Sequence, residues 1–384
     1  MGLCHSGGML KTLAVSGYRS LRDVIVPLEP LTVITGPNGS GKSNLYRALR
    51  LLAAAASGTM VGAIAHEGGL PSLLWAGPQQ GGTEGTLRTV PIAVQLGFAS
   101  DELGYLVDLG QPQIEPTSPF VRDPEIKREQ IFAGPIAKPS SLLIDRLRQV
   151  TRVRDGSWHI VNQQLAPFES ILIDLADGDT GPELLGLRRM VSGWRFYDHF
   201  RTDADAPVRA MQIGTRQRTL SHGGENLAAV WASIQDAGFG SPLDAEVARA
   251  FPGARVRVHA VEGRFQLVME QPGILRPLET AELSDGTLRY LLLCAALLPA
   301  HPAGLIVLNE PESSLHPSLI DPLARLITAA SARSQVVVVT HAPALASALT
   351  AAGSLTHQLE PTLAGTIIAG QGFLDVPAWN WGKR

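Results

Sequence analysis

A glycine-rich segment near the N-terminus has the residue types and spacing of a phosphate-binding loop. Its sequence, Gly36-Pro37-Asn38-Gly39-Ser40-Gly41-Lys42-Ser43, matches the pattern G-x-x-x-x-G-K-[ST]. In such a loop the backbone N–H groups surround phosphate oxygens, and the helix that follows adds its positive N-terminal end. Lys42 would reach the β- and γ-phosphates, and Ser43 would ligate Mg²⁺. The segment therefore predicts a nucleotide site.

Two polar side chains follow a short apolar segment near the C-terminus. Residues 305–308 have the composition of a buried strand, and Asn309 and Glu310 come directly after it. Open α/β sheets bind ligands at the C-terminal ends of their strands, so Glu310 would polarise the water that attacks the γ-phosphate. The alternative is a structural acid at a helix entry. The glycine loop favours the catalytic interpretation.

Two further segments are informative only through their order in the chain. His341 follows a run of valines and Thr340, where a polar side chain would sense the γ-phosphate; alone it would be an ordinary strand-capping histidine. The segment from Leu283 to Thr287 contains Ser284, Asp285 and Gly286, and alone it would be a helix N-cap.

Hydrophobic periodicity predicts the elements that position these residues. Short strands are expected at 10–15, 24–28 and 31–35, and a helix at 44–56. The glycine-rich stretch 58–85 is expected to be a loop, and 86–109 a β-ribbon in which Val90, Ile92, Val94 and Leu96 alternate. Helices are expected at 283–298 and 315–330, and buried parallel strands at 305–308 and 335–339.

Changes in composition predict the domain organisation. Prolines 112, 116, 119 and 124 mark a boundary. We expect a disordered leader at 1–9, an ATPase core lobe formed by 10–110 and 274–370, an inserted lobe of helices and strands at 111–273, and a tail at 371–384.

Composition excludes several classes of protein. The 384 residues carry a net charge of −3, so no global basic field indicates nucleic acid. Two cysteines are too few for a disulfide framework or a zinc site, which fits a reducing cytoplasm. No apolar run reaches membrane-spanning length. Seven arginines within residues 188–218 would suit a phosphate backbone, but a solvated surface with internal ion pairs is favoured.

The order of the motifs resembles the ATP-binding-cassette superfamily, specifically its RecF/SMC-like branch of soluble ATPases. Residues 36–43 resemble Walker A, 283–287 the signature motif, 305–310 Walker B, 313–316 the D-loop, and His341 the switch histidine. Residues 20–23, 194–198, 224–228 and 283–289 resemble a bacterial family of predicted "AAA family" ATPases without a coiled-coil arm. The similarity covers most of residues 10–350. It implies an α/β P-loop NTPase fold, with a mixed sheet core flanked by helices and an inserted α+β lobe.

The resemblance also implies a mechanism. In such heads the signature motif faces the ATP of a second subunit, so Ser284 and Gly286 of one copy would contact the γ-phosphate bound at Lys42 of the other. ATP would clamp two copies head to tail and hydrolysis would release them, because ATP binds the closed dimer better than the open monomer. The implied cofactors are ATP and Mg²⁺, and the implied assembly is an ATP-dependent homodimer away from membranes.

One residue departs from the family pattern. Asn309 stands where the Walker B aspartate is usual. Its carbonyl oxygen can still be offered to Mg²⁺, directly or through water, but it brings no negative charge, although Glu310 and Glu312 keep the neighbourhood acidic. The Q-loop glutamine stays open among Gln79, Gln80 and Gln95.

The leading hypothesis is an ATP-hydrolysing switch protein in DNA repair or in defence against foreign DNA, with DNA and a partner nuclease inferred from family analogy. Only 43 residues follow His341, so we expect nuclease activity to come from a partner. A non-hydrolysing, ATP-gated interaction module is the alternative that Asn309 suggests. A transporter ATPase subunit is disfavoured by the long middle segment and the sequence of 283–289.

Overall fold

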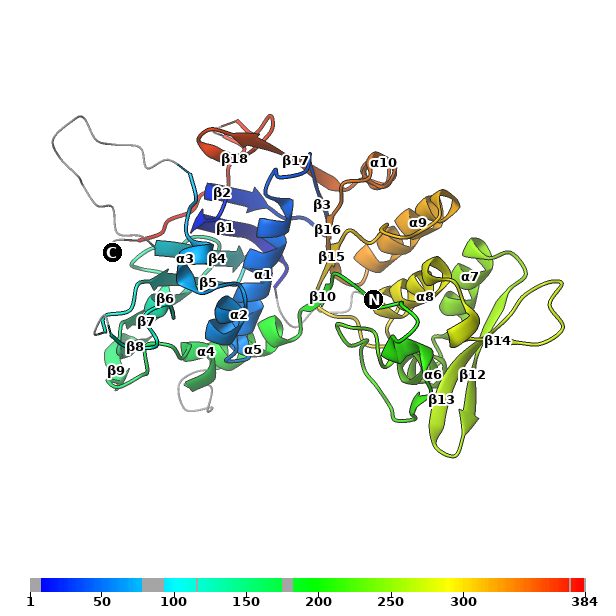
Figure 1. The fold of residues 1–384 in the computed structure, drawn as a ribbon. Coiled ribbons are helices and arrows are strands. Elements are labelled where there is room, and N and C mark those ends of the chain that lie inside the picture. The colour runs from blue at the N-terminus through cyan, green and yellow to red at the C-terminus, as the bar shows by residue number, and fades with distance from the viewer. Residues whose placement is uncertain (1–7, 78–92, 115–116, 175–181, 373, 383–384) are drawn as a thin grey trace. The chain divides into compact units, whose positions relative to one another are not determined.

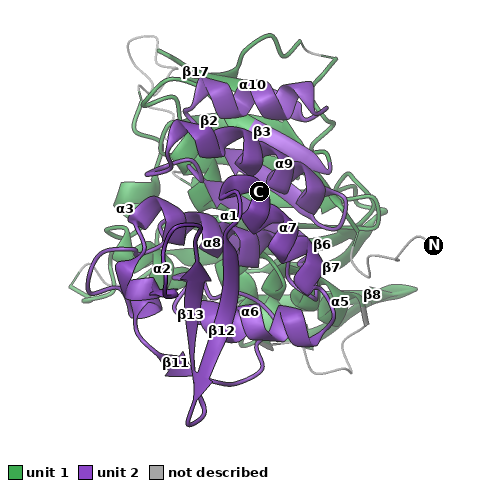
Figure 2. Cartoon of the chain, turned by 90° about the vertical axis from the view of Figure 1, so that its right-hand side faces the viewer, with its two compact units in different colours: residues 1–29, 34–194, 357–384 green, residues 30–33, 195–356 purple. Residues whose placement is uncertain are grey.

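The protein, seen here as a computed structural model, divides into two compact units. The structure describes residues 8–77, 93–114, 117–174, 182–372 and 374–382. Unit 1 comprises residues 1–29, 34–194 and 357–384, and unit 2 comprises residues 30–33 and 195–356. Figure 1 labels the elements and Figure 2 colours the two units. The boundary falls within β3 (Leu31–Thr35) and near the start of β17 (Leu355–Thr362).

An antiparallel sheet of eight strands forms the centre of unit 1, in the order β2-β1-β4-β5-β6-β7-β8-β9. The strands are β1 (Leu10–Tyr18), β2 (Leu21–Pro27), β4 (Ala93–Ser100), β5 (Leu103–Gly110), β6 (Glu125–Ala133), β7 (Leu142–Leu147), β8 (Val150–Asp155) and β9 (Ser157–Asn162). Val94 and Leu96 are buried as the ribbon pattern requires, and Val90 and Ile92 lie outside the described residues. Gln95 and the residues of β4 that follow Leu96 are buried too, so both faces of this strand are covered.

Helices pack on this sheet and present the glycine loop. They are α1 (Lys42–Ala56), α2 (Met60–His66), α3 (Leu70–Leu73), α4 (Ile171–Asp174) and α5 (Pro182–Ser192). The apolar face expected for α1 is buried, and this helix contacts β1 and β4. The loop expected at 58–85 is wrong for its described part, because α2 and α3 lie within it. Burial of Met60 and Ile64, four positions apart, offsets the weak helix propensity of a glycine-rich segment.

The C-terminal segment packs within unit 1. β17 pairs with β18 (Gly365–Ile368) in an antiparallel hairpin. Beyond it, the Trp379 ring contacts Phe132 with ring centroids 6.0 Å apart. Asn380 Nδ2 donates to the Ala137 carbonyl at 3.0 Å, and Arg128 donates to the Trp381 carbonyl. The described part of residues 371–384 is therefore a packed element of the unit.

Parallel strands form the centre of unit 2. β10 (Arg195–Tyr197) pairs with β15 (Leu305–Asn309), which pairs with β16 (Gln335–Val339), both in parallel. The continuous apolar runs predicted buried parallel strands, and β16 is buried along its whole length. Because Tyr197, Leu308 and Val338 are in register, the residues that follow each strand emerge at one edge of the sheet.

The other elements of unit 2 surround a large apolar core that contains Trp231 and Tyr290. The helical elements are η2 (Pro207–Arg209), α6 (Leu227–Asp236), α7 (Gly240–Ala250), η3 (Thr280–Glu282), α8 (Asp285–Leu297), η4 (Pro317–Leu319), α9 (Ile320–Ser331) and α10 (Pro343–Ala351). A small antiparallel sheet has the order β11-β13-β12, with β14 paired to β13. Its strands are β11 (Gln212–Ile213), β12 (Arg255–Val261), β13 (Arg264–Glu270) and β14 (Leu278–Glu279).

The compact units differ from the expected lobes. Residues 111–273 do not cluster as one body: those up to Trp194 belong to unit 1, and those from Arg195 onward belong to unit 2. The reason is strand pairing. β6 to β9 extend the antiparallel sheet that β1, β4 and β5 begin, whereas β10 joins the parallel strands β15 and β16. Among the described residues, no helix is both long and apolar enough to cross a membrane.

Candidate functional site

The glycine loop of unit 1 connects β3 to the start of α1. Gly41 is the N-cap of α1, with a φ of +98° that L-residues with a side chain rarely adopt. A Cβ atom there would also lie 2.5 Å from Thr366 Oγ1. The first turn of α1 has no acidic residue and no side-chain cap. Asn44 N donates to the Gly41 carbonyl at 3.0 Å, and the start of a helix without a side-chain cap is a position that suits an anion.

Polar groups around this loop suit a phosphate ligand. Lys42 is buried, and its Nζ donates to the Gly36 carbonyl at 2.7 Å and to the Pro37 carbonyl at 2.9 Å, so the side chain folds back across the loop. Ser40 Oγ is buried and has no hydrogen-bond partner within the described part of the chain. Ser43 is an exposed residue in the first turn of α1.

In unit 2 the strand ends bring the predicted hydrolytic residues together. Glu310 N donates to the Val339 carbonyl at 2.7 Å, which ties the residue after β15 to the end of β16. Glu310 has a φ of +48°, an uncommon backbone conformation of the kind that clusters at functional sites. His341 Nδ1 lies 3.3 Å from Glu310 Oε1, and both side chains are partly exposed. This carboxylate and imidazole are therefore adjacent and reachable from solvent.

Glu312 holds the segment after β16 in place, a role that the sequence did not reveal. Its Oε1 accepts from Thr340 Oγ1 at 2.5 Å and from the N–H groups of His341 and Ala342 at 3.3 Å each. Its side chain is only 6% exposed. Glu312 therefore fixes the backbone of His341 relative to Glu310.

Arg289 places a buried positive charge among these acids. Its guanidinium donates to the backbone carbonyls of Asp198 and Glu310, at 3.3 and 3.2 Å. Burial lowers the pKa of Arg289, and the carboxylates of Glu312, Asp198 and Glu310 oppose that shift. Because arginine stays protonated in proteins, its charge balances part of the acidic cluster. Sequence analysis assigned no role to Arg289. The feature that could have identified it is its position in the first turns of α8, shortly after the signature segment.

The signature segment begins α8, and Ser284 is its N-cap. Ser284 Oγ accepts from Thr287 N at 3.2 Å, so the N-cap interpretation of Ser284 holds in the structure. The Ser284 residue is nevertheless exposed. Gly286 lies against the segment after β15, because a Cβ atom there would come within 2.9 Å of the Ser314 carbonyl oxygen. Glycine at 286 thus permits the close approach of the first turn of α8 to this segment within unit 2.

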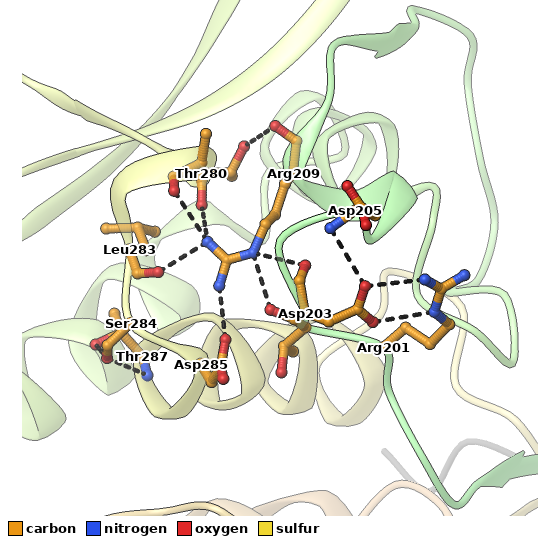
Figure 3. Close-up of polar contacts among 11 residues, drawn as sticks. Arg201, Asp203, Asp205, Arg209, Thr280, Leu283, Ser284, Asp285 and Thr287 are labelled. Carbon is orange, nitrogen blue, oxygen red and sulfur yellow. Dashed lines mark hydrogen bonds and ion pairs between the residues drawn. The ribbon is translucent and has the colours of Figure 1, made fainter.

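Arg209 holds the segment that precedes α8, as Figure 3 shows. Its Nη1 donates to the carbonyls of Thr280, Ala281 and Leu283 at 2.9, 3.1 and 2.9 Å. Its Nη2 pairs with Asp285 at 2.7 Å. Beside it, hydrogen bonds from Arg276 and from the Glu279 backbone lower the pKa of Glu282 to about 2. The turn before Ser284 is therefore held by arginine contacts at neutral pH.

We expect Arg209→Ala to loosen the signature segment. Its loss would leave several carbonyls without a donor, so the free energy of unfolding should fall by about 1–3 kcal/mol. Hydrogen exchange should quicken across residues 280–287. The matched control is Arg201→Ala, since Arg201 makes an exposed ion pair with Asp203 in the same region, and exposed pairs contribute little to stability. Unchanged exchange at 280–287 would contradict this role.

Two further expectations concern the Q-loop glutamine and the arginine-rich stretch. Gln95 lies in β4, buried, with Nε2 donating to Asp108 Oδ2 at 3.3 Å. Gln79 and Gln80 lie outside the described residues, so the Q-loop glutamine stays unassigned. Arg201, Arg209 and Arg216 of the arginine-rich stretch form ion pairs with acidic residues, in agreement with the favoured interpretation.

The site residues thus fall into two groups, each described within its own unit. Unit 1 carries the whole glycine loop, Gly36 to Ser43. Unit 2 brings together Asn309, Glu310 and His341, and places Gly286 beside the segment after β15. Among the described residues, no group of three or more His, Cys, Asp or Glu side chains could hold a metal ion. Mg²⁺ bound with a nucleotide usually takes one or two protein ligands, phosphates and waters.

Comparison with known families identifies the architecture. A family model described as "AAA domain, putative AbiEii toxin, Type IV TA system" matches residues 31–347. The structure is similar to one described as the "SmcHead bound to the C-winged helix domain of ScpA", with a TM-score of 0.50 and 15% identity, covering 94% of this chain and 97% of that one. The fold is similar to that of an SMC head, in agreement with the α/β P-loop fold that the motifs predicted.

Two curated relatives are nucleases by name. The Old nuclease of Escherichia phage P2 is 23% identical over 382 residues, which cover 90% of this chain and 58% of that protein. The OLD nuclease of Thermus scotoductus is 52% identical over 44 residues, 12% of this chain and 8% of that protein. The chain therefore spans little more than half the length of the longer match.

Proposed function

The chain belongs to the family described as "AAA domain, putative AbiEii toxin, Type IV TA system", and on that premise we propose that it binds and hydrolyses ATP as a dimerising switch. The observation that carries this proposal is the pairing of Glu310 with His341 at the ends of β15 and β16, in a chain whose glycine loop opens α1. The process it serves would be DNA repair or defence against foreign DNA, in the cytoplasm.

Each residue then has a defined role. The glycine loop and Lys42 bind the phosphates of ATP, and Ser43 and Asn309 hold Mg²⁺, which neutralises charge on the phosphates. Asn309 Oδ1 fits such a ligand, because it is a buried acceptor with no hydrogen-bond partner among the described residues. Glu310 orients the attacking water, and His341 senses the γ-phosphate.

The exposure of Ser284 in the signature segment supports the proposed dimerisation. Ser284 is exposed although it caps α8, so its surface is available to a second copy. Ser284 and Gly286 of one copy would contact the ATP held at Lys42 of the other. ATP would shift the equilibrium toward the dimer to the extent that it binds the closed dimer more tightly than the open monomer.

The decisive experiment measures phosphate release by the purified protein with Mg²⁺-ATP, with and without DNA, together with its mass in solution with and without nucleotide. We expect Mg²⁺-dependent hydrolysis and an ATP-dependent dimer. Absence of nucleotide binding would refute the proposal, and a monomer at every ATP concentration would refute the dimer.

A nuclease partner is the proposed effector. Both curated relatives are named as nucleases, and the longer match leaves about two fifths of that protein outside the alignment. ATP-driven closure of the head would then control the partner's access to DNA.

Asn309 favours a second candidate function, an ATP-gated interaction module that hydrolyses ATP very slowly. Weaker metal binding by a neutral ligand would retain ATP binding and dimerisation but reduce turnover. Phosphate release at background level despite tight ATP binding would favour this candidate.

A further inference from the structure

We propose that Asp198 is a positioning residue for Mg²⁺: it orients the Asn309 amide so that Oδ1 faces the metal, and it supplies the negative charge that Asn309 lacks. This inference rests on the proposed ATP-dependent function. Asp198 is not among the residues expected to act at the site, and it lies 111 positions from Asn309 in the chain.

The sheet register brings the two residues together. β10 and β15 run in parallel, and Tyr197 pairs with Leu308, the last residue of β10 with the penultimate residue of β15. The next residues are Asp198 and Asn309, which therefore emerge side by side at the C-terminal edge of the sheet. Asn309 Nδ2 donates to Asp198 Oδ1 at 2.7 Å, a short hydrogen bond to a charged acceptor.

This hydrogen bond decides which way the amide faces. An ionised carboxylate only accepts hydrogen bonds, so Asn309 must turn its NH₂ group toward Asp198 and its carbonyl oxygen away. That oxygen, Oδ1, is buried and unpaired among the residues the structure describes. Leaving a buried acceptor unpaired costs about 1–3 kcal/mol. A bound cation would satisfy it.

The pair also reproduces the charge of an aspartate. The Asp198 carboxylate gives the hydrogen-bonded pair a net charge of −1, and it polarises the amide so that Oδ1 becomes a stronger ligand. The guanidinium of Arg289 donates to the backbone carbonyl of Asp198 and not to its carboxylate. Arg289 also interacts with the charges of Glu310 and Glu312. Mutation of a residue that hydrogen-bonds to a metal ligand typically lowers metal affinity by about 10–100-fold.

A purely structural role makes a different prediction. If the Asn309–Asp198 hydrogen bond only joined β10 to β15, Asp198→Asn would keep most of it, because an amide oxygen also accepts from Nδ2. Metal affinity would then be unchanged. The two explanations therefore differ in whether metal affinity depends on the negative charge of Asp198.

The experiment measures Mn²⁺ affinity by electron paramagnetic resonance in the presence of a saturating non-hydrolysable ATP analogue. We expect Asp198→Asn to weaken Mn²⁺ binding by about 10–100-fold. The exchange variant, Asp198→Asn with Asn309→Asp, restores the charge at the pair and should regain affinity. Asn309→Asp alone places two carboxylates in contact, so it should lower thermal stability without metal. The control is Asp236→Asn, an exposed acid in α6 that pairs with Arg216.

The outcomes separate the two proposals. If the wild-type protein binds neither the analogue nor Mn²⁺, the ATP-dependent function itself fails. If the wild type binds both and Asp198→Asn binds Mn²⁺ equally well, the role of Asp198 is overturned. An exchange variant that folds, by its thermal unfolding, but binds Mn²⁺ as weakly as Asp198→Asn would also overturn it.

Discussion

Glu310→Gln is expected to bind ATP, accumulate as a dimer and lose about 10²–10⁴-fold in hydrolysis rate. The amide has nearly the same size as the carboxylate, so contacts with the Val339 carbonyl through Glu310 N are kept. The amide cannot take a proton from the attacking water, and it polarises that water less than a negative charge does. ATP would then hold the closed dimer that hydrolysis normally releases.

Two measurements test Glu310 together. Phosphate release should fall while the affinity for a fluorescent ATP analogue is retained, and the mass in solution should shift to the dimer with Mg²⁺-ATP. Glu262→Gln is the matched control, because Glu262 is exposed in the turn between β12 and β13 and should leave hydrolysis unchanged. Normal turnover by Glu310→Gln would remove Glu310 from the catalytic role.

Lys42→Ala is expected to abolish measurable ATP binding, with affinity falling by at least about 10–100-fold. Lys42 is buried in the glycine loop, where its ammonium group contacts two loop carbonyls. Its removal takes away a charge-assisted contact in a partly desolvated site. Because α1 keeps its other residues, the fold should persist.

Titration with a labelled ATP analogue measures this effect directly. Lys127→Ala is the control, since Lys127 is a partly exposed lysine of unit 1 that pairs with Glu125. Its affinity should match the wild type. Lys42→Ala with unchanged ATP affinity and an unchanged melting temperature would place the nucleotide elsewhere in the chain.

The elements that carry the motifs were predictable because their signals are local. The strand expected at 31–35 and the helix expected at 44–56 flank the glycine loop in the structure, as β3 and α1. The apolar face of α1 and the valine run of β16 predicted a half-buried helix and a fully buried strand. The two helices at 60–73 were missed because packing, rather than propensity, stabilises them.

The division into units was not predictable, because it depends on which strands pair. Prolines at 112–124 marked a boundary in composition, yet β6 continues the sheet of β5 across it. The true change of unit falls between Trp194 and Arg195, where β10 pairs with β15 more than a hundred positions later. Such pairings connect residues far apart in sequence, and no local pattern reports them.

The sequence by itself determined which residue types stand at each strand end and helix start: Lys42 in the loop, Asn309 and Glu310 after one strand, His341 after another. Only the tertiary structure decided their partners. Parallel register set Asp198 beside Asn309, Arg289 of α8 contacts the Glu310 carbonyl, and Glu312 contacts Thr340 after β16. Backbone conformation follows from neighbouring residues, whereas the electrostatic environment of a side chain depends on whatever the folded chain brings beside it.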